Sequence, residues 1–96
     1  MLSVEDALAS VFEAIDEVNM QLPAHQHVTK TPATALTGDQ SPLDSLALIN
    51  LIVALEEVIA RQRGEALQLL DEDLLGEPDG PYSTPATLAA YVASAA

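Results

Sequence analysis

Apolar and charged positions alternate through the first twenty residues with the period of a helix. The apolar positions at this spacing are Val4, Leu8, Val11, Phe12, Ile15 and Val18. Ser3, followed three residues later by Asp6, has the form of a capping box, which marks a helix start. The pattern predicts an amphipathic helix that begins after Ser3 and ends near residues 20–22, before Pro23.

Residues 23–42 show no apolar period and are rich in Pro, Thr, His, Gly and Gln, so a long loop is expected there. A loop of this length is unusual in so small a domain and is often functional.

The next segment predicts a second helix over residues 44–63, which Gly64 would end. At about 100° per residue, this helix has two apolar faces. The broad face is expected to lie in the core and consists of Leu48, Leu51, Ile52, Leu55, Val58 and Ile59. The second, narrower face lies beside Ser45 and consists of Leu46, Ile49 and Val53, with Glu56 and Glu57 one turn further along.

Two explanations of the narrower face stay open. The long loop or a later short helix covers it, as happens to central helices of small bundles, or the domain leaves it exposed. In the second case, Leu46, Ile49 and Val53 form an apolar strip rimmed by carboxylates, which is typical of a docking surface.

The last third of the chain predicts an extended stretch over 67–70, one short helical turn over 71–75 and a turn-rich connection. A final helix follows, with Thr84 as its cap, Pro85 in its first position and Leu88, Tyr91 and Val92 facing inward. Tyr82 and Tyr91 are expected to pack in the core or at its rim, with their hydroxyls reaching water. The expected fold is a single all-α domain over residues 1–96. It is a small four-helix bundle, with three main helices, a short third helix and a long loop between the first two helices.

Charge changes this picture from a generic bundle to a strongly acidic one. The 96 residues include three Lys and Arg against fifteen Asp and Glu, which gives a formal net charge of −12. Such a surface repels nucleic acid and anionic lipid and attracts partners with basic patches. The longest apolar run, residues 46–55, is broken by Asn50 and is too short to span a membrane. The acidic amino terminus does not resemble a signal peptide, so a cytoplasmic monomer without stable membrane insertion is expected.

The chain has no cysteine, which excludes disulfides and thiolate metal sites. Any thiol chemistry must therefore arrive on a cofactor. The pair His25 and His27 would need further ligands and a fixed frame to hold a metal, so exposed loop histidines are expected instead and no metal site is predicted.

Ser45 allows three interpretations. It caps the second helix, a role that Asp44 fills equally well. As a catalytic nucleophile it would need a base and an oxyanion site, and the only histidines lie in the loop, so no catalytic residue and no enzymatic activity are predicted. As a modified residue it needs only an exposed hydroxyl on a firm support, and a phosphodiester there would meet the positive end of the helix dipole.

The segment "LDSLALINLIVALEE" resembles the attachment segment of acyl carrier proteins and related peptidyl or aminoacyl carriers. In that family, Asp-Ser-Leu opens the second helix of a four-helix bundle, and an apolar helix with acidic residues at its end follows. The resemblance extends to the first amphipathic helix, the long loop, the short third helix and the closing "TPATLAAYVASA", hence to most of the chain.

The resemblance implies that a phosphopantetheinyl transferase attaches 4'-phosphopantetheine from coenzyme A to Ser45, where the arm carries acyl groups as thioesters. Asp44 would orient the site and contact the transferase. Leu46, Ile49 and Val53 would be apolar contacts, and Glu56 and Glu57 acidic contacts, to the basic patches of acyl-loading and acyl-transferring enzymes.

Ala47 and Asn50 stand where fatty-acid carriers usually have acidic residues, and the glycine usual before the motif is absent. These departures favour a specialised lipid, polyketide or similar pathway over housekeeping fatty-acid synthesis. Two alternatives stay open: an aminoacyl or peptidyl carrier, and an unmodified acidic helical adaptor that binds one protein partner.

Overall fold

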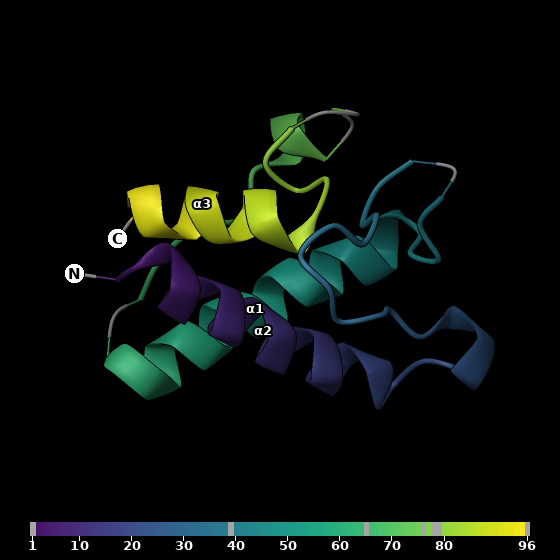
Figure 1. Ribbon diagram of the computed structural model, residues 1–96, viewed down its shortest axis with the longest axis horizontal. Helices are drawn as coiled ribbons and strands as arrows, with labels where there is room; N and C mark the ends of the chain where they lie inside the picture. Colours follow the sequence, from purple (N-terminus) through teal and green to yellow (C-terminus); the bar gives the residue numbers. More distant parts are fainter. Residues whose placement is uncertain (1, 39, 65, 76, 78–79, 96) are drawn as a thin grey trace.

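The computed structural model describes residues 2–38, 40–64, 66–75, 77 and 80–95. Within these residues the chain forms three α-helices and no strand (Figure 1). The helices are α1 (Val4–Asn19), α2 (Ser45–Arg63) and α3 (Pro85–Ala95). Two single 3₁₀ turns, η1 (Ala24–Gln26) and η2 (Glu72–Leu74), lie in the connections. The all-α prediction is confirmed, whereas the expected short third helix is represented only by the three residues of η2.

The helix α1 begins as predicted and ends slightly early. The Ser3 hydroxyl accepts a hydrogen bond from Asp6 N at 3.1 Å. The Asp6 carboxylate binds Arg63, on α2, so only one half of the capping box forms, the hydrogen bond from Asp6 N to the Ser3 hydroxyl. The helix ends at Asn19 because the Asn19 amide turns to the loop, where it pairs with both backbone groups of Val28.

Local capping also sets the ends of α2 and the start of α3. The Asp44 carboxylate accepts from Ala47 N at 2.7 Å, and Gly64 ends α2 in the left-handed conformation, at φ 69°. Pro85 opens α3, and the Thr84 hydroxyl accepts from Thr87 N at 3.1 Å. These boundaries are the predicted ones.

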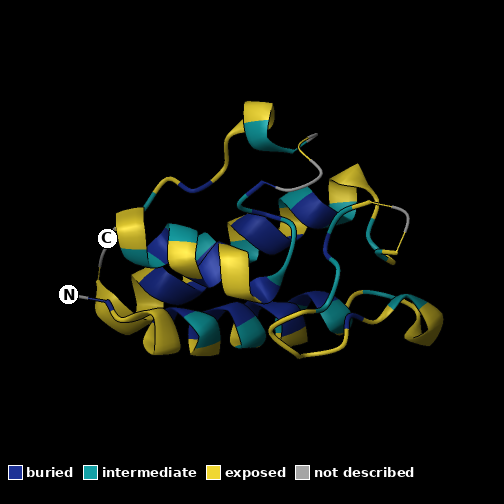
Figure 2. Cartoon of the chain, turned by 45° about the horizontal axis from the view of Figure 1, so that its top comes forward, coloured by how far each residue is buried: buried dark blue, intermediate teal, exposed yellow. Residues whose placement is uncertain are grey.

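The core lies where α1 packs against both α2 and α3. Figure 2 shows buried residues on the facing sides of the helices and exposed residues on their outer sides. The predicted core face of α2 is buried throughout, and it consists of Leu48, Leu51, Ile52, Leu55, Val58 and Ile59. Leu88 and Val92 of α3 are buried, while Phe12 and Tyr91 are partly buried against the core. No helix in the described part of the chain has the length and apolar character needed to cross a membrane.

The long connection from α1 to α2 is fastened at several places, among them Asn19, at the end of α1, and Ser83, just before α3. The Asn19 side chain binds Val28 N at 2.8 Å and Val28 O at 3.0 Å. Further along, Leu36 is fully buried and its N–H donates to Ser83 O at 2.8 Å, just before α3. The loop that leads to Ser45 is therefore anchored on both sides of the bundle.

Tyr82 corrects one prediction. Its side chain is fully buried, and its hydroxyl donates to Leu69 O and accepts from Asp71 N at 2.9 Å instead of reaching water. The ring meets Tyr91 edge to face, with the centroids 6.1 Å apart. The hydroxyl is satisfied by an extended backbone segment, an arrangement with no signal in the spacing of the residues.

Candidate functional site

Ser45 is the first residue of α2 and is exposed to solvent. Because the Asp44 carboxylate caps the helix, the Ser45 side chain is not needed as a cap. Among the described residues, the Ser45 hydroxyl has no hydrogen-bond partner within the protein. The first backbone N–H groups of α2 lie beside it, at the positive end of the helix dipole. With respect to the described residues, the hydroxyl is therefore free, and it stands on a capped helix.

The narrower apolar face of α2 is uncovered in large part. The Leu46 side chain is 68% exposed and that of Val53 is 37% exposed, while Ile49 is half-buried. Neither the loop nor η2 covers the strip as a whole. Of the two explanations that the sequence leaves open, the structure favours the exposed strip.

Two grooves run beside this strip and share Asn50 as a wall residue. The first has a volume of about 280 Å³ and is lined by Leu22, Gln26, Pro42, Asp44, Leu46, Ala47 and Asn50. The second has a volume of about 180 Å³ and is lined by Glu17, Val18, Gln21, Asn50, Val53, Ala54 and Glu57. The exposed surface thus extends from α2 onto the end of α1 and the residues that follow it.

The two acidic residues of the predicted contact surface have different surroundings. Glu57 is exposed. Glu56 is half-buried, and its carboxylate accepts hydrogen bonds from Leu69 N at 2.6 Å and Leu70 N at 3.2 Å. Glu56 therefore holds a backbone segment of its own chain, whereas Glu57 is available to a partner.

The positive charges of the chain are paired away from Ser45. Lys30 binds Asp16 at 3.0 Å, Arg61 binds Glu17 at 2.6 Å and Arg63 binds Asp6 at 3.1 Å. All three carboxylates belong to α1, and no Lys or Arg occurs between residues 30 and 61 or after residue 63. The electrostatic potential around Ser45 and the strip is accordingly negative.

A small cavity adjoins Ser45 on the side away from the grooves. Its volume is about 80 Å³, and it is lined by Leu36, Thr37, Gly38, Leu43, Asp44, Ser45, Leu48 and Leu75. The described residues of this lining include no histidine, and their one carboxylate, Asp44, accepts the hydrogen bond from Ala47 N.

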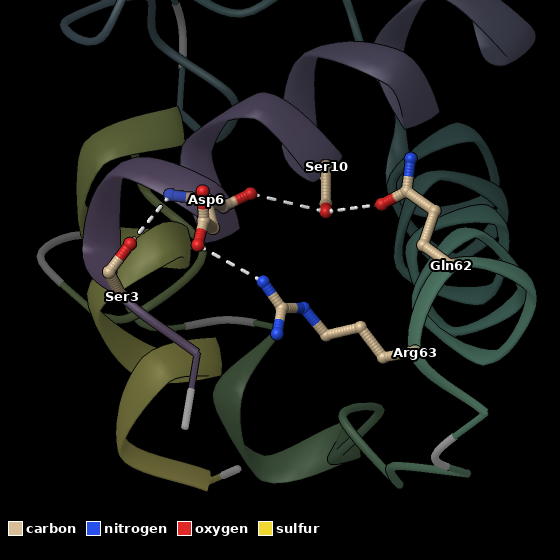
Figure 3. A network of polar contacts seen from close by, with 5 residues as sticks. All are labelled: Ser3, Asp6, Ser10, Gln62 and Arg63. Carbon is tan, nitrogen blue, oxygen red and sulfur yellow. Dashed lines mark hydrogen bonds and ion pairs between the residues drawn. The ribbon is translucent and has the colours of Figure 1, made fainter.

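A larger hollow, about 490 Å³, lies at the far end of α2, and the polar side chains among its described lining residues are bound to one another. Figure 3 shows its polar side chains bound to one another. Arg63 pairs with the Asp6 carboxylate, and the buried Ser10 hydroxyl lies 2.9 Å from Gln62 Oε1 and 3.2 Å from Asp6 O. These contacts join α1 to α2 and leave Ser45 as the better candidate site.

His25 and His27 flank Gln26, a wall residue of the first groove, and neither is among the residues that line the grooves or the cavity beside Ser45. His25 is exposed, and the His27 ring binds Leu22 O at 2.9 Å. In the part of the chain that the structure describes, no three His, Asp or Glu side chains gather in a way that would hold a metal ion.

Comparison with known proteins gives this site no precedent. No protein-family model matches the chain, and no similar curated protein or solved structure was found. The proposed function therefore rests on the geometry of the site.

Proposed function

We propose that this chain is a non-catalytic carrier protein, with Ser45 as the attachment site of 4'-phosphopantetheine. The observation that carries the proposal is the free, exposed Ser45 hydroxyl on a helix that Asp44 already caps. A hydroxyl modified by another enzyme needs this accessibility and no base of its own. When attached, the arm supplies a terminal thiol that carries an acyl group as a thioester, which the cysteine-free chain itself lacks.

The surroundings of Ser45 fit a phosphodiester. The free N–H groups at the start of α2 favour an anion, and no carboxylate other than Asp44 lines the adjoining cavity among the described residues. Asp44 holds the helix start and stands next to the hydroxyl, where it can contact the transferase. In this proposal η2 takes the place of the short third helix of a four-helix carrier.

The exposed strip and the negative charge beside it support the proposal that partner enzymes dock next to Ser45. Leu46, Ile49 and Val53, with Glu57 beside them, form a surface for the enzymes that load and unload the arm, and these enzymes would present basic patches. A tether raises the effective concentration of the acyl group at each partner's active site, so weak contacts suffice. The cargo pathway is a specialised lipid or polyketide-type pathway, with an aminoacyl or peptidyl cargo as the alternative, in the cytoplasm.

The strip alone also suits an unmodified adaptor, since the grooves beside Asn50 do not involve the Ser45 hydroxyl. One experiment separates the two functions. The protein is incubated with coenzyme A, Mg²⁺ and a phosphopantetheinyl transferase of broad specificity, and its intact mass is measured. The carrier gains one phosphopantetheine, and Ser45→Ala gains none.

Ser45→Ala is a sharp control because it removes a side chain that is not used as a cap, so its melting temperature should equal that of the wild type. An unchanged wild-type mass would favour the adaptor, and a gain that persists in Ser45→Ala would place the modification elsewhere.

A further inference from the structure

Residues 67–75, here called the strap, cross the bundle between the end of α2 and the turn-rich connection to α3 (Figure 1). Leu69 is fully buried, and Leu67, Leu74 and Leu75 pack partly against the core. Among the described residues, 66–70 make no backbone–backbone hydrogen bond to a helix. The strap is therefore held by side chains.

Two side chains from different parts of the fold hold the centre of the strap. Glu56, on α2, accepts from Leu69 N and Leu70 N at 2.6 and 3.2 Å. The buried Tyr82 hydroxyl binds Leu69 O and Asp71 N from the other side. Four polar groups of the strap backbone thus depend on one carboxylate and one phenol.

The contacts of Glu56 and Tyr82 with the strap affect the surroundings of Ser45, because the strap continues into η2. The Asp71 side chain accepts from Asp73 N at 3.0 Å and so caps η2. Leu75, at the end of η2, is one wall of the cavity beside Ser45. Fixing Asp71 therefore fixes η2, and η2 places Leu75 against the cavity.

The cavity beside Ser45 is small. Its volume is about 80 Å³, whereas an apolar protein cavity that binds benzene has a volume of about 150 Å³. The core residues beyond it, Leu51, Ile52 and Leu55, are fully buried, so the interior is already filled. With the strap in place, an acyl chain of more than a few carbons does not fit into this cavity.

We infer that Glu56 and Tyr82 determine cargo specificity by holding the strap closed, so that the native cargo is a short acyl group. This inference rests on the proposed carrier function and adds the class of cargo to it. Glu56 and Tyr82 are positioning residues, since they act through Leu75 and do not touch the arm.

The test loads Ser45 with a two-carbon or a twelve-carbon acyl phosphopantetheine and compares the melting temperatures of the two forms. If a long acyl chain is buried in the native state and not in the unfolded state, it would raise the melting temperature by on the order of 10 °C. The wild-type forms should melt together. In Tyr82→Phe and Glu56→Ala the strap is loosened, so the twelve-carbon form should melt higher than the two-carbon form of the same variant.

Glu56→Gln is the matched control, because its amide oxygen still accepts from the strap N–H groups while the charge is gone. It should behave as the wild type does. A second readout needs no cargo: exchange of the Leu69 and Leu70 amide hydrogens should be about tenfold faster in Glu56→Ala, with the Ile52 amide of α2 unchanged. Glu56→Gln should keep the slow exchange.

The possible failures are distinguishable. A chain that accepts no phosphopantetheine overturns the carrier function and the inference together. A loaded wild-type protein that is stabilised by the twelve-carbon chain overturns the inference alone, as does a pair of variants whose long-chain and short-chain forms still melt together.

Discussion

The Tyr82 side chain contacts three other residues of the fold, Leu69, Asp71 and Tyr91. It bridges Leu69 O and Asp71 N, while its ring packs against Tyr91. Burial raises the pKa of the Tyr82 hydroxyl above its ordinary value of 10.0, because the phenolate would lose its hydration. The neutral form is therefore the one that the fold requires.

This pKa shift predicts a loss of stability in alkali. Below pH 10 the phenol is neutral in both the folded and the unfolded chain. As the pH rises through 10.0, the unfolded chain ionises first, so the free energy of unfolding falls until the folded-state pKa is reached. Urea titrations at several pH values would measure this decline.

Tyr82→Phe provides the comparison. At neutral pH it should be less stable by about 1–3 kcal/mol, since Asp71 N and Leu69 O lose their partner. It cannot ionise at this position, so the difference in stability from the wild type should narrow between about pH 9 and 11. A difference that stays constant across this range would mean that the Tyr82 pKa is not raised.

The residues of the site differ in how far their roles are readable from the sequence. Ser45 and the strip are marked by a local motif and a helical period, and the structure places them at the surface. The tethers from Glu56 and Tyr82 each span thirteen residues and end on backbone groups of an irregular segment. Such contacts depend on how distant elements pack, so neither composition nor periodicity indicates them.

At the scale of elements, the helix boundaries were predictable because each depends on neighbouring residues. Asp44, Gly64 and Thr84 act within one turn of the ends that they set. The loop of residues 23–42 was recognisable only by its lack of a pattern. Its turn η1 and its attachment to Val28 and Leu36 involve single side chains or isolated backbone pairs, which produce no period.

The exposed strip on α2 leads to a prediction about partner recognition. Leu46→Ala and Glu57→Lys should each lower the kcat/KM of the phosphopantetheinyl transferase about tenfold, since hot-spot contacts typically contribute that much. Helicity, measured by circular dichroism, should stay unchanged because both side chains are exposed. Glu56→Lys is unsuitable for this purpose because it would also break the contact with the strap.

Val4→Ala is the matched control for the apolar change. Val4 is 51% exposed but lies at the start of α1, and α2 runs from Ser45 at the other end of the molecule (Figure 1). The transferase should modify Val4→Ala at the wild-type rate. Equal effects of Val4→Ala and Leu46→Ala would show that the strip is not a specific contact surface.

At the scale of the whole molecule, repulsion among carboxylates opposes folding. The net charge is −12, and the three ion pairs are exposed enough to contribute little each, about 0–1 kcal/mol. Added salt should therefore weaken the repulsion among carboxylates more than it weakens the attraction within the ion pairs. The melting temperature is expected to rise by several degrees between about 0.01 and 0.3 M NaCl.

Scanning calorimetry at a series of salt concentrations would measure this rise. A double variant, Glu72→Gln with Glu77→Gln, removes two negative charges from exposed side chains. Its melting temperature should rise less with added salt. A melting temperature that falls with added salt would show that the ion pairs on α1 outweigh the repulsion.

The ion pairs also have a consequence for encounters in solution. Arg61 and Arg63 lie near the C-terminal end of α2, about 24 and 27 Å along the helix axis from Ser45, and each pairs with a carboxylate of α1. A cationic partner that approaches Ser45 therefore meets no repulsion from these two arginines, because neither is close and each is already paired with a carboxylate.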